Sequence, residues 1–174
     1  MENALIALIS MAIILGGTMT LMLGSIPSID MLSSSWKQMT QQAGEMRRTE
    51  LTTDNYTISD GGAQVNVIIS NNGEVSLSDF SSWDVIIKYS SDTSSYAKWL
   101  PYTPDNLTDN KWTVDGIYFN GSAETIEPNI LNPGEDMEIL IQLNPEVATS
   151  TTNWVTISTP NGIAAHLIFQ RGGT

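Results

Sequence analysis

Residues 4–23 read ALIALISMAIILGGTMTLML, and this stretch decides what kind of fold the chain can have. No charged residue occurs from Asn3 to Ile29, and apolar side chains would lie on every side of a helix formed by residues 4–23. A helix of about 20 apolar residues matches the hydrocarbon thickness of a bilayer. A helix without a polar side has to be surrounded by lipid or by other helices. The sequence therefore predicts an N-terminal helix that is buried in a membrane or in an assembly.

The apolar stretch differs from a cleaved secretory signal. Such a signal has a basic start, an apolar run of about 7–15 residues and a small-residue cleavage site. Here nothing basic precedes the run, which is longer than that, and the first cation of the chain is Lys37. We therefore interpret the stretch as part of the working protein.

An amphipathic pattern continues the helix beyond Leu23. Apolar residues recur there at spacings of three and four, which is typical of one helical stripe. The pattern predicts a nearly continuous helix to about residue 50, with a candidate kink at Gly24 and Pro27. We expect a helical segment at 1–52 whose stripe packs against the domain that follows. The stripe consists of Ile26, Ile29, Leu32, Trp36, Met39, Ala43 and Met46.

The rest of the chain alternates apolar and polar residues with a period of two. Glycine, proline and asparagine turns separate the alternating runs, as in Asn71-Asn72-Gly73 and Pro160-Asn161-Gly162. About eight short strands with such turns favour an antiparallel, immunoglobulin-like β-sandwich at 53–174, and hence an α+β fold. The predicted strands are Ala63–Ser70, Trp83–Tyr89, Tyr96–Leu100, Trp112–Phe119, Glu124–Ile130, Met137–Leu143, Asn153–Ser158 and Ile163–Gln170.

Charge and cysteine content narrow the possible functions. The net charge is −12 with seven lysines and arginines, so the clustered cations that nucleic acid requires are missing. The absence of cysteine rules out disulfides, thiolate metal sites and cysteine nucleophiles. Sixteen of the 19 acidic residues occur at or after Glu50, so neighbouring sandwiches should repel one another. In any assembly, most of the cohesion should then come from the helix.

The sequence offers little for catalysis. His166, the single histidine, is predicted on the outer face of the last strand, because it alternates with Ala165 and Leu167. A Ser-His-Asp triad would need this histidine, but no serine occurs in a G-x-S-x-G elbow. We therefore expect no enzyme, no catalytic residue and no cofactor.

Two other groups of residues could bind ligands. Asp105, Asp109 and Asp115 form an oxygen-rich region of the kind that binds calcium, but without the regular D-x-[DN]-x-[DN]-G spacing. A solvated loop is favoured over a metal site. Trp83, Trp99, Trp112 and Trp154 could stack on sugars, although tryptophans within strands more often belong to the core.

Several polar residues suggest modification or pairing. Asn55, Asn106 and Asn120 each begin an N-x-[ST] sequon and are candidate glycosylation sites, expected in loops or at strand ends. Glu2 is the one charge at the apolar end. It either complements the positive end of the helix dipole or neutralises an α-amino group, its own or a neighbour's, within a packed bundle.

Three short motifs accompany this architecture: Asn71-Asn72-Gly73-Glu74, Leu131-Asn132-Pro133-Gly134-Glu135 and Thr159-Pro160-Asn161-Gly162. With the long helix and the acidic sandwich, they make the chain resemble type IV pilin-like filament subunits. Among these it is most similar to archaellins, the filament proteins of the archaeal swimming organelle, and to related archaeal pilins. The resemblance covers the whole chain.

The resemblance implies a structural subunit of an extracellular surface filament that serves motility or adhesion. Its precursor would sit in the cytoplasmic membrane, lose a short basic leader to a dedicated peptidase, and join the filament through an ATPase-driven assembly platform. The chain would polymerise with copies of itself through its helix. The predicted filament-core contacts are Leu5, Ile6, Leu8, Ile9, Ile13, Ile14, Leu15, Met19, Leu21 and Met22.

Two other interpretations remain open. A stator-type component of the same organelle also has one helix and one sandwich, but it would stay in the membrane. A membrane-tethered binding module would instead use the sandwich loops to hold a glycan or an ion. Purified surface filaments made of this chain would separate the first interpretation from the other two.

Overall fold

The computed structural model describes the backbone of residues 2–172 and the side chains of residues 3–20 and 29–172. The chain divides into two compact units, Met1–Gly44 and Glu45–Thr174. The first unit is helical. The second contains the last turn of the helix and all of the described strands.

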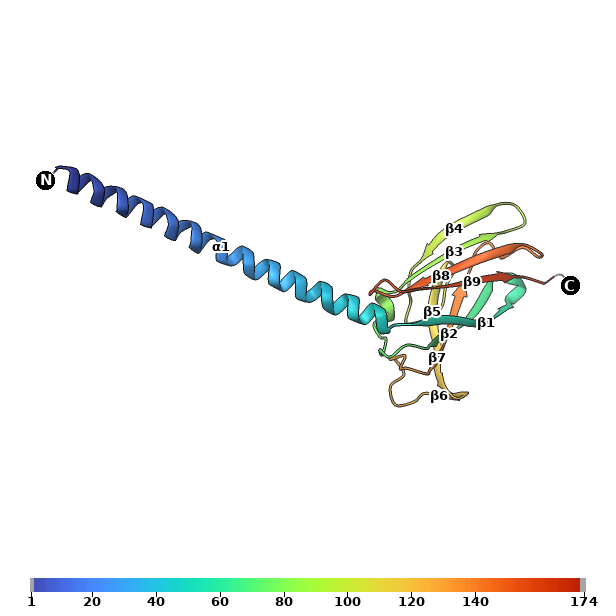
Figure 1. Cartoon of the computed structure of the whole chain (residues 1–174). Coiled ribbons are helices and arrows are strands. Elements are labelled where there is room, and N and C mark those ends of the chain that lie inside the picture. The colour runs from blue at the N-terminus through green and yellow to red at the C-terminus, as the bar shows by residue number, and fades with distance from the viewer. Residues whose placement is uncertain (1, 173–174) are drawn as a thin grey trace. The chain divides into compact units, whose positions relative to one another are not determined.

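The helix α1 extends over Glu2–Arg48, as Figure 1 shows. It is helical without interruption at Gly24 and Pro27, the candidate kink. Arg47 and Arg48 lie in its last turn, where positive charge is favourable against the negative end of the helix dipole. The prediction of one nearly continuous helix is confirmed.

The first strand, β1, spans Leu51–Ser59 and begins three residues after the helix ends. The boundary expected between residues 52 and 53 therefore lies inside β1. The sequence pattern did not indicate this strand, because its register to β2 shifts between Thr53 and Asn55. Such a bulge breaks the alternation from which a strand is inferred.

The strands form two antiparallel sheets, in the orders β1-β2-β7-β5-β6 and β4-β3-β8-β9. The fold is α+β with a β-sandwich, which confirms the predicted class. The remaining strands are β2 (Gln64–Asn71), β3 (Asp84–Ser90), β4 (Ser95–Leu100), β5 (Lys111–Phe119), β6 (Ser122–Ala123), β7 (Asp136–Gln142), β8 (Thr152–Ser158) and β9 (Ala164–Gln170).

The strand predicted at Glu124–Ile130 does not form. These residues make turns, and the Glu124 carboxylate accepts hydrogen bonds from the backbone N–H groups of Ile126 at 2.6 Å and Glu127 at 3.4 Å. The same two hydrogen bonds lower the pKa of Glu124. A side chain that binds the local backbone in this way competes with sheet pairing, and Pro128 removes a further donor.

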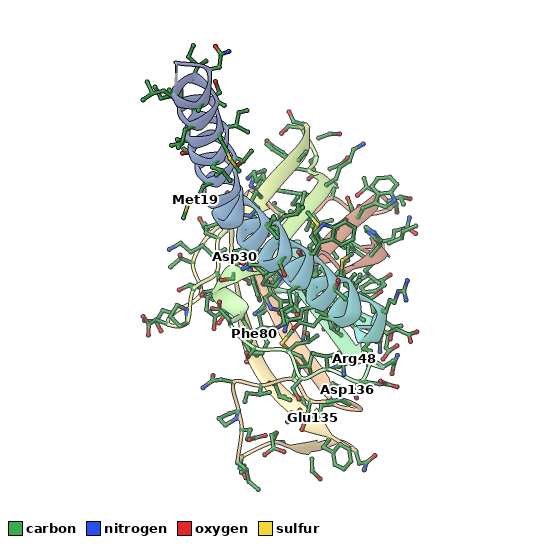
Figure 2. The ribbon with its side chains drawn as sticks, turned by 60° about the vertical axis from the view of Figure 1, so that its left-hand side comes forward. Met19, Asp30, Arg48, Phe80, Glu135 and Asp136 are labelled. Carbon is green, nitrogen blue, oxygen red and sulfur yellow. The ribbon has the colours of Figure 1, made fainter. Side chains whose placement is uncertain are left out.

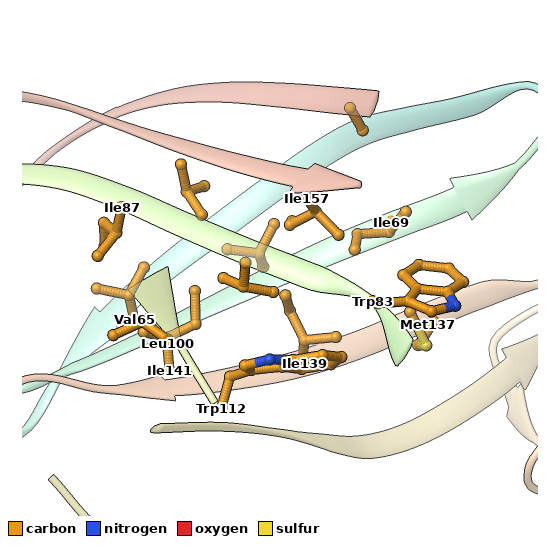
Figure 3. Close-up of a cluster of buried hydrophobic side chains, with 14 of the residues drawn as sticks. Val65, Ile69, Trp83, Ile87, Leu100, Trp112, Met137, Ile139, Ile141 and Ile157 are labelled. Carbon is orange, nitrogen blue, oxygen red and sulfur yellow. The ribbon is translucent and has the colours of Figure 1, made fainter. Parts of the chain in front are cut away.

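The core lies between the two sheets and is made by alternate residues of both. Figure 3 shows Val65, Ile69, Met137, Ile139 and Ile141 of the five-stranded sheet facing the other sheet. Alternate strand residues point to one face, so β2 and β7 each place every second side chain in this core. The four-stranded sheet and its flanks contribute Trp83, Ile87, Leu100 and Ile157.

Candidate assembly surfaces and the junction of helix and sandwich

The N-terminal half of α1 carries many exposed apolar side chains. Figure 2 shows side chains projecting from several sides of the helix between its N-terminal end and Met19. Eight of the ten predicted contact residues are 52–73% exposed: Leu5, Ile6, Leu8, Ile9, Ile13, Ile14, Leu15 and Met19. The side chains of Leu21 and Met22, and that of Glu2, lie outside the described residues. The contacts with other chains stay a prediction.

The few hydroxyl groups on this surface are already hydrogen-bonded within the helix. Ser10 donates to the carbonyl of Ile6 at 2.9 Å, and Thr20 donates to that of Gly16 at 2.8 Å. A hydroxyl group that is hydrogen-bonded within its own helix needs no outside partner, so it can lie in an apolar environment. Within α1, Asn3–Thr20 is long and apolar enough to cross a membrane, judged by length and composition.

In the second half of α1, the stripe residues Ile29, Leu32, Trp36 and Met39 are 60–68% exposed. They belong to a different compact unit from the sandwich, and the expected packing of the stripe on that domain stays a prediction. Ile26 lies outside the described side chains. Met46 is the stripe residue that lies in the same compact unit as the sandwich. The stripe is therefore a second row of exposed apolar side chains on α1.

The end of α1 is joined to the sandwich by backbone hydrogen bonds. The last carbonyl groups of a helix have no partner within it. Here the N–H of Glu74 donates to the carbonyl of Arg48 at 2.7 Å, and the N–H of Asn72 donates to that of Glu50 at 2.9 Å. The hydroxyl of Thr49 donates to the carbonyl of Glu45 at 2.8 Å.

Gly73 lies directly against this junction. A Cβ atom at this position would be 2.5 Å from the carbonyl oxygen of Arg48 and 2.6 Å from the backbone nitrogen of Glu50. Both atoms belong to the backbone, so they cannot turn away as a flexible side chain would. The glycine of the Asn71–Glu74 motif is thus needed for close approach of two chain segments.

Asn71 fixes the loop that receives the helix end. Its buried amide nitrogen donates to the carbonyls of Val75 at 2.9 Å and Leu131 at 3.0 Å. Its amide oxygen accepts the N–H of Gly73 at 3.1 Å. Its backbone nitrogen donates to the carbonyl of Glu135 at 3.0 Å, which ties the motif to the second one, Leu131–Glu135.

The third motif reaches the same junction. The side-chain nitrogen of Asn161 donates to the hydroxyl of Thr49 at 2.9 Å. Gly162 has a φ of +89°, and a Cβ there would lie 3.8 Å from the terminal methyl group of Met46. The three motifs quoted for the family resemblance therefore meet around one feature, the entry of the helix into the sandwich. The sequence by itself indicates only that these motifs are separate turns.

The other candidate ligand residues are His166 and the aspartates Asp105, Asp109 and Asp115, for which the sequence favours a surface position and a solvated loop. His166 is exposed as predicted, and its Nδ1 lies 3.0 Å from the hydroxyl of Thr156. Within the described residues, no three acidic, histidine or cysteine side chains are grouped in a way that could hold a metal ion. Asp109 accepts a hydrogen bond from the amide of Asn144 at 2.6 Å, and Asp115 lies at a bulge of β5.

The tryptophans divide into two pairs. Trp83 and Trp112 are buried in the core, as expected for strand and near-strand tryptophans. Trp99 and Trp154 are 58% and 43% exposed, so the expectation of a core position was wrong for them. The parity of β8 carried the signal, because Val155 and Ile157 define its inner face and Trp154 falls on the other.

The three candidate glycosylation residues are all exposed. Asn106 lies in a loop and Asn120 in a turn, as predicted. Asn55 lies within β1 at its bulge and not in a loop, and its side-chain oxygen accepts the N–H of Tyr56 at 2.8 Å. The assignment of glycans to these positions remains a prediction.

These features define a class of protein: a folded β-sandwich on a long helix whose apolar side chains are exposed. No protein-family profile matches the chain, and no curated protein matches it in sequence. The fold itself does occur in solved structures, among them three that contain archaellum components.

Three such structures are similar in fold. The archaeal flagellum of Methanospirillum hungatei strain JF1 matches with a TM-score of 0.53 and 16% identity, over 99% of this chain and 94% of that chain. The archaellum periplasmic stator protein FlaG of Sulfolobus acidocaldarius matches with a TM-score of 0.51 and 22% identity, over 70% of this chain and 99% of that chain. The FlaF–FlaG stator complex of the same organism matches with the same score and identity, over 70% of this chain and 89% of that chain. The resemblance to archaellum proteins is thus confirmed at the level of the fold.

Proposed function

We propose that this chain is a structural subunit of a helical surface filament of the archaellum or type IV pilus class. It polymerises through its N-terminal helix and serves motility or adhesion. The single observation that carries the proposal is the exposure of apolar side chains on all sides of residues 3–20. A membrane anchor needs lipid around it, whereas a filament core supplies other copies of the same helix. The full-length fold likeness to a filament protein supports the second environment.

The role requires no catalytic site and no cofactor. Before assembly the same helix would hold the chain in the cytoplasmic membrane, with the sandwich outside. By family resemblance, a leader peptidase and an ATPase-driven platform would process and insert it. The final location is an extracellular filament, and nucleic acid is not a partner.

A stator-type role is the second candidate. The two stator matches cover 70% of this chain, which is about the share that the sandwich occupies. A stator would remain in the membrane at low copy number. The third interpretation is a tethered binding module. The exposed side chains of Trp99 and Trp154 are the observation that supports it.

The experiment that separates these roles compares two isoleucine-to-aspartate variants in cells that produce the chain. Ile13→Asp places a charge on the apolar half of α1, where a packed bundle cannot accept it. Ile126→Asp is the matched control, since Ile126 is 86% exposed on the sandwich. Electron microscopy and mass spectrometry of sheared surface material should show filaments of this chain in the wild type and the control, and none for Ile13→Asp.

Either of two results would overturn the filament role. Normal filaments from Ile13→Asp cells would show that the helix surface is not the core contact. Surface filaments that contain only another protein, with this chain confined to the membrane fraction, would favour the stator.

A further inference from the structure

The outer face of the sheet β4-β3-β8-β9 carries an apolar and aromatic patch. Six large apolar side chains of the sandwich are exposed, and four of them lie on this face: Ile86, Trp99, Trp154 and Ile168. The pairing register places Ile86 beside Trp99 and Trp154 beside Ile168. Lys88 pairs with Trp154 in the register, so it lies between the two apolar pairs. We call these five residues the β4–β9 patch.

The β4–β9 patch contains a cation, Lys88, and has a carboxylate, that of Asp84, at its edge. The indole N–H of Trp99 donates to Asp84 at 2.8 Å, which holds this carboxylate at the Trp99 end of the patch. The ammonium group of Lys88 lies 5.6 Å from the centre of the Trp154 ring, within cation–π range. The Lys88–Trp154 pair, at the other end of the patch from Asp84, therefore combines an exposed aromatic ring with a positive charge.

The outer face of the other sheet has the opposite character. Asp136 and Glu138 point outward from β7, since Met137 and Ile139 face the core. The hydroxyl of Ser70 lies between the carboxylates of Asp54 and Asp136. Asp115 is exposed on the neighbouring strand β5. We call this acidic region the β2–β7–β5 face.

The β2–β7–β5 face also contains a hollow with an apolar wall. A space of about 230 Å³ is lined by Ile68, Tyr118, Gly121, Asp136 and Glu138. Desolvation, followed by the nearby carboxylates of Glu138 and Asp115, raises the pKa of Tyr118. A projecting apolar group that carries a cation would complement the hollow in both shape and charge.

We infer that the β4–β9 patch of one copy docks on the β2–β7–β5 face of a second copy, with Lys88 and Trp154 facing the hollow. The two faces lie on opposite sides of one sandwich, so the contact joins different surfaces and does not close into a pair. Contacts of this kind extend into rings or open helical arrays. The inference rests on the proposed self-assembly and adds to it a specific contact in the outer layer. It also modifies the expectation of simple repulsion, because a local attraction is set into an acidic surface.

The absence of cysteine allows a direct cross-linking test on the full-length chain in detergent. One preparation carries Lys88→Cys and one affinity tag, and a second carries Asp115→Cys and another tag. The two are mixed and treated with a short bismaleimide. The control mixture pairs Lys88→Cys with Thr93→Cys, which is exposed in the turn between β3 and β4 and does not belong to the β2–β7–β5 face. We expect the first mixture to give at least about fivefold more mixed-tag dimer than the control.

A second variant tests the role of charge without changing the cross-linking positions. Glu138→Gln in the Asp115→Cys chain should lower the mixed-tag yield severalfold, because it removes a carboxylate from the hollow. Equal yields in the test and control mixtures would overturn the inference. So would dimers that join two Lys88→Cys chains, because the patch would then pack on itself.

The test and the filament experiment can fail independently. Cross-linking in detergent measures contact between sandwiches and does not require the helices to polymerise. Filaments that form from wild-type chains whose faces do not cross-link would leave the filament role intact and remove this contact. Cross-linking by a chain that never forms filaments would support the contact between sandwiches and count against the filament role.

Discussion

The helix and the sandwich treat their apolar side chains in opposite ways. In the sandwich, Val65, Ile87 and Ile139 are fully buried, and both sheets supply the surfaces that cover them. In the helix, Leu8 and Ile13 are about 70% exposed. The sandwich therefore buries its own apolar core, whereas the helix exposes apolar side chains of the same kinds. One chain thus combines a domain that covers its apolar residues with a helix that does not.

The strongest test of this contrast is to dissolve the assembly in two ways. Detergent competes for apolar surface, whereas salt mainly screens charge between exposed groups. If the helices provide most of the cohesion, a mild detergent should disperse filaments almost completely, and salt from low to high concentration should have little effect. Light scattering with electron microscopy measures this. Filaments that resist detergent but dissolve in salt would show that charge interactions, and not the helices, provide most of the cohesion.

A pair of truncations tests the same contrast within single chains. Ile139→Ala removes buried atoms from the centre of the core and should destabilise the sandwich by about 2–5 kcal/mol. Leu8→Ala removes a similar group from the uncovered helix and should leave the unfolding free energy of the sandwich within about 0.5 kcal/mol. Denaturant unfolding in detergent, followed by the fluorescence of the buried tryptophans, measures both. Similar losses for the two variants would show that the helix surface contributes to the fold of the sandwich.

The sequence predicted the parts whose pattern is long and regular. The uncharged run after Asn3 and the alternation of Val65, Val67 and Ile69 were sufficient for the helix and for a sandwich. β1 was missed because a bulge interrupts its alternation, and the Glu124–Ile130 strand was wrong because a side chain captures the local backbone there. The spacing of apolar residues reveals neither the bulge nor the side-chain hydrogen bonds.

The predictability of the candidate site differs between its parts. The apolar contact surface follows from residue type alone. The junction could not be foreseen, because Gly73 and Asn161 are brought to the helix end by long-range pairing. The β4–β9 patch was within reach, because the parity of β8 places Trp154 opposite Val155. Residue type favours a core position for this tryptophan, whereas the alternation of inner and outer residues along β8 places it on the outer face.

Two glycine substitutions locate the point where the helix and the sandwich meet. Gly73→Ala would place a Cβ 2.5 Å from the backbone of the junction and should cost about 1–3 kcal/mol. Gly44→Ala is the matched control, one turn before the helix end, where a Cβ would meet nothing within 4 Å. It should be neutral or stabilising by up to about 1 kcal/mol, because alanine is the better helix former. Equal effects of the two variants would show that the junction tolerates side-chain bulk.

The smallest effect concerns a tyrosine inside the sandwich. Tyr89 is buried, and its hydroxyl has no hydrogen-bond partner among the described residues. Burial, together with the nearby Tyr96, raises the pKa of Tyr89 to about 12. Since an unpartnered buried hydroxyl gives little stability, Tyr89→Phe should change the unfolding free energy at pH 7 by less than about 1 kcal/mol. Tyr56→Phe should instead destabilise, because the Tyr56 hydroxyl accepts the N–H of Gln170 at 3.2 Å.

The pH dependence of Tyr89→Phe follows from the same shift. A raised pKa means that the folded state holds the phenol proton more tightly than the unfolded state. The stability linked to this proton is therefore complete below about pH 10, where an unfolded tyrosine begins to ionise, and is lost as the pH approaches 12. Over that interval the wild type should lose on the order of 2 kcal/mol more than Tyr89→Phe, as denaturant titrations at fixed pH would show. Parallel curves for the two proteins would mean that the Tyr89 hydroxyl reaches solvent, and that the interior of the sandwich is less closed to water than its contrast with the helix requires.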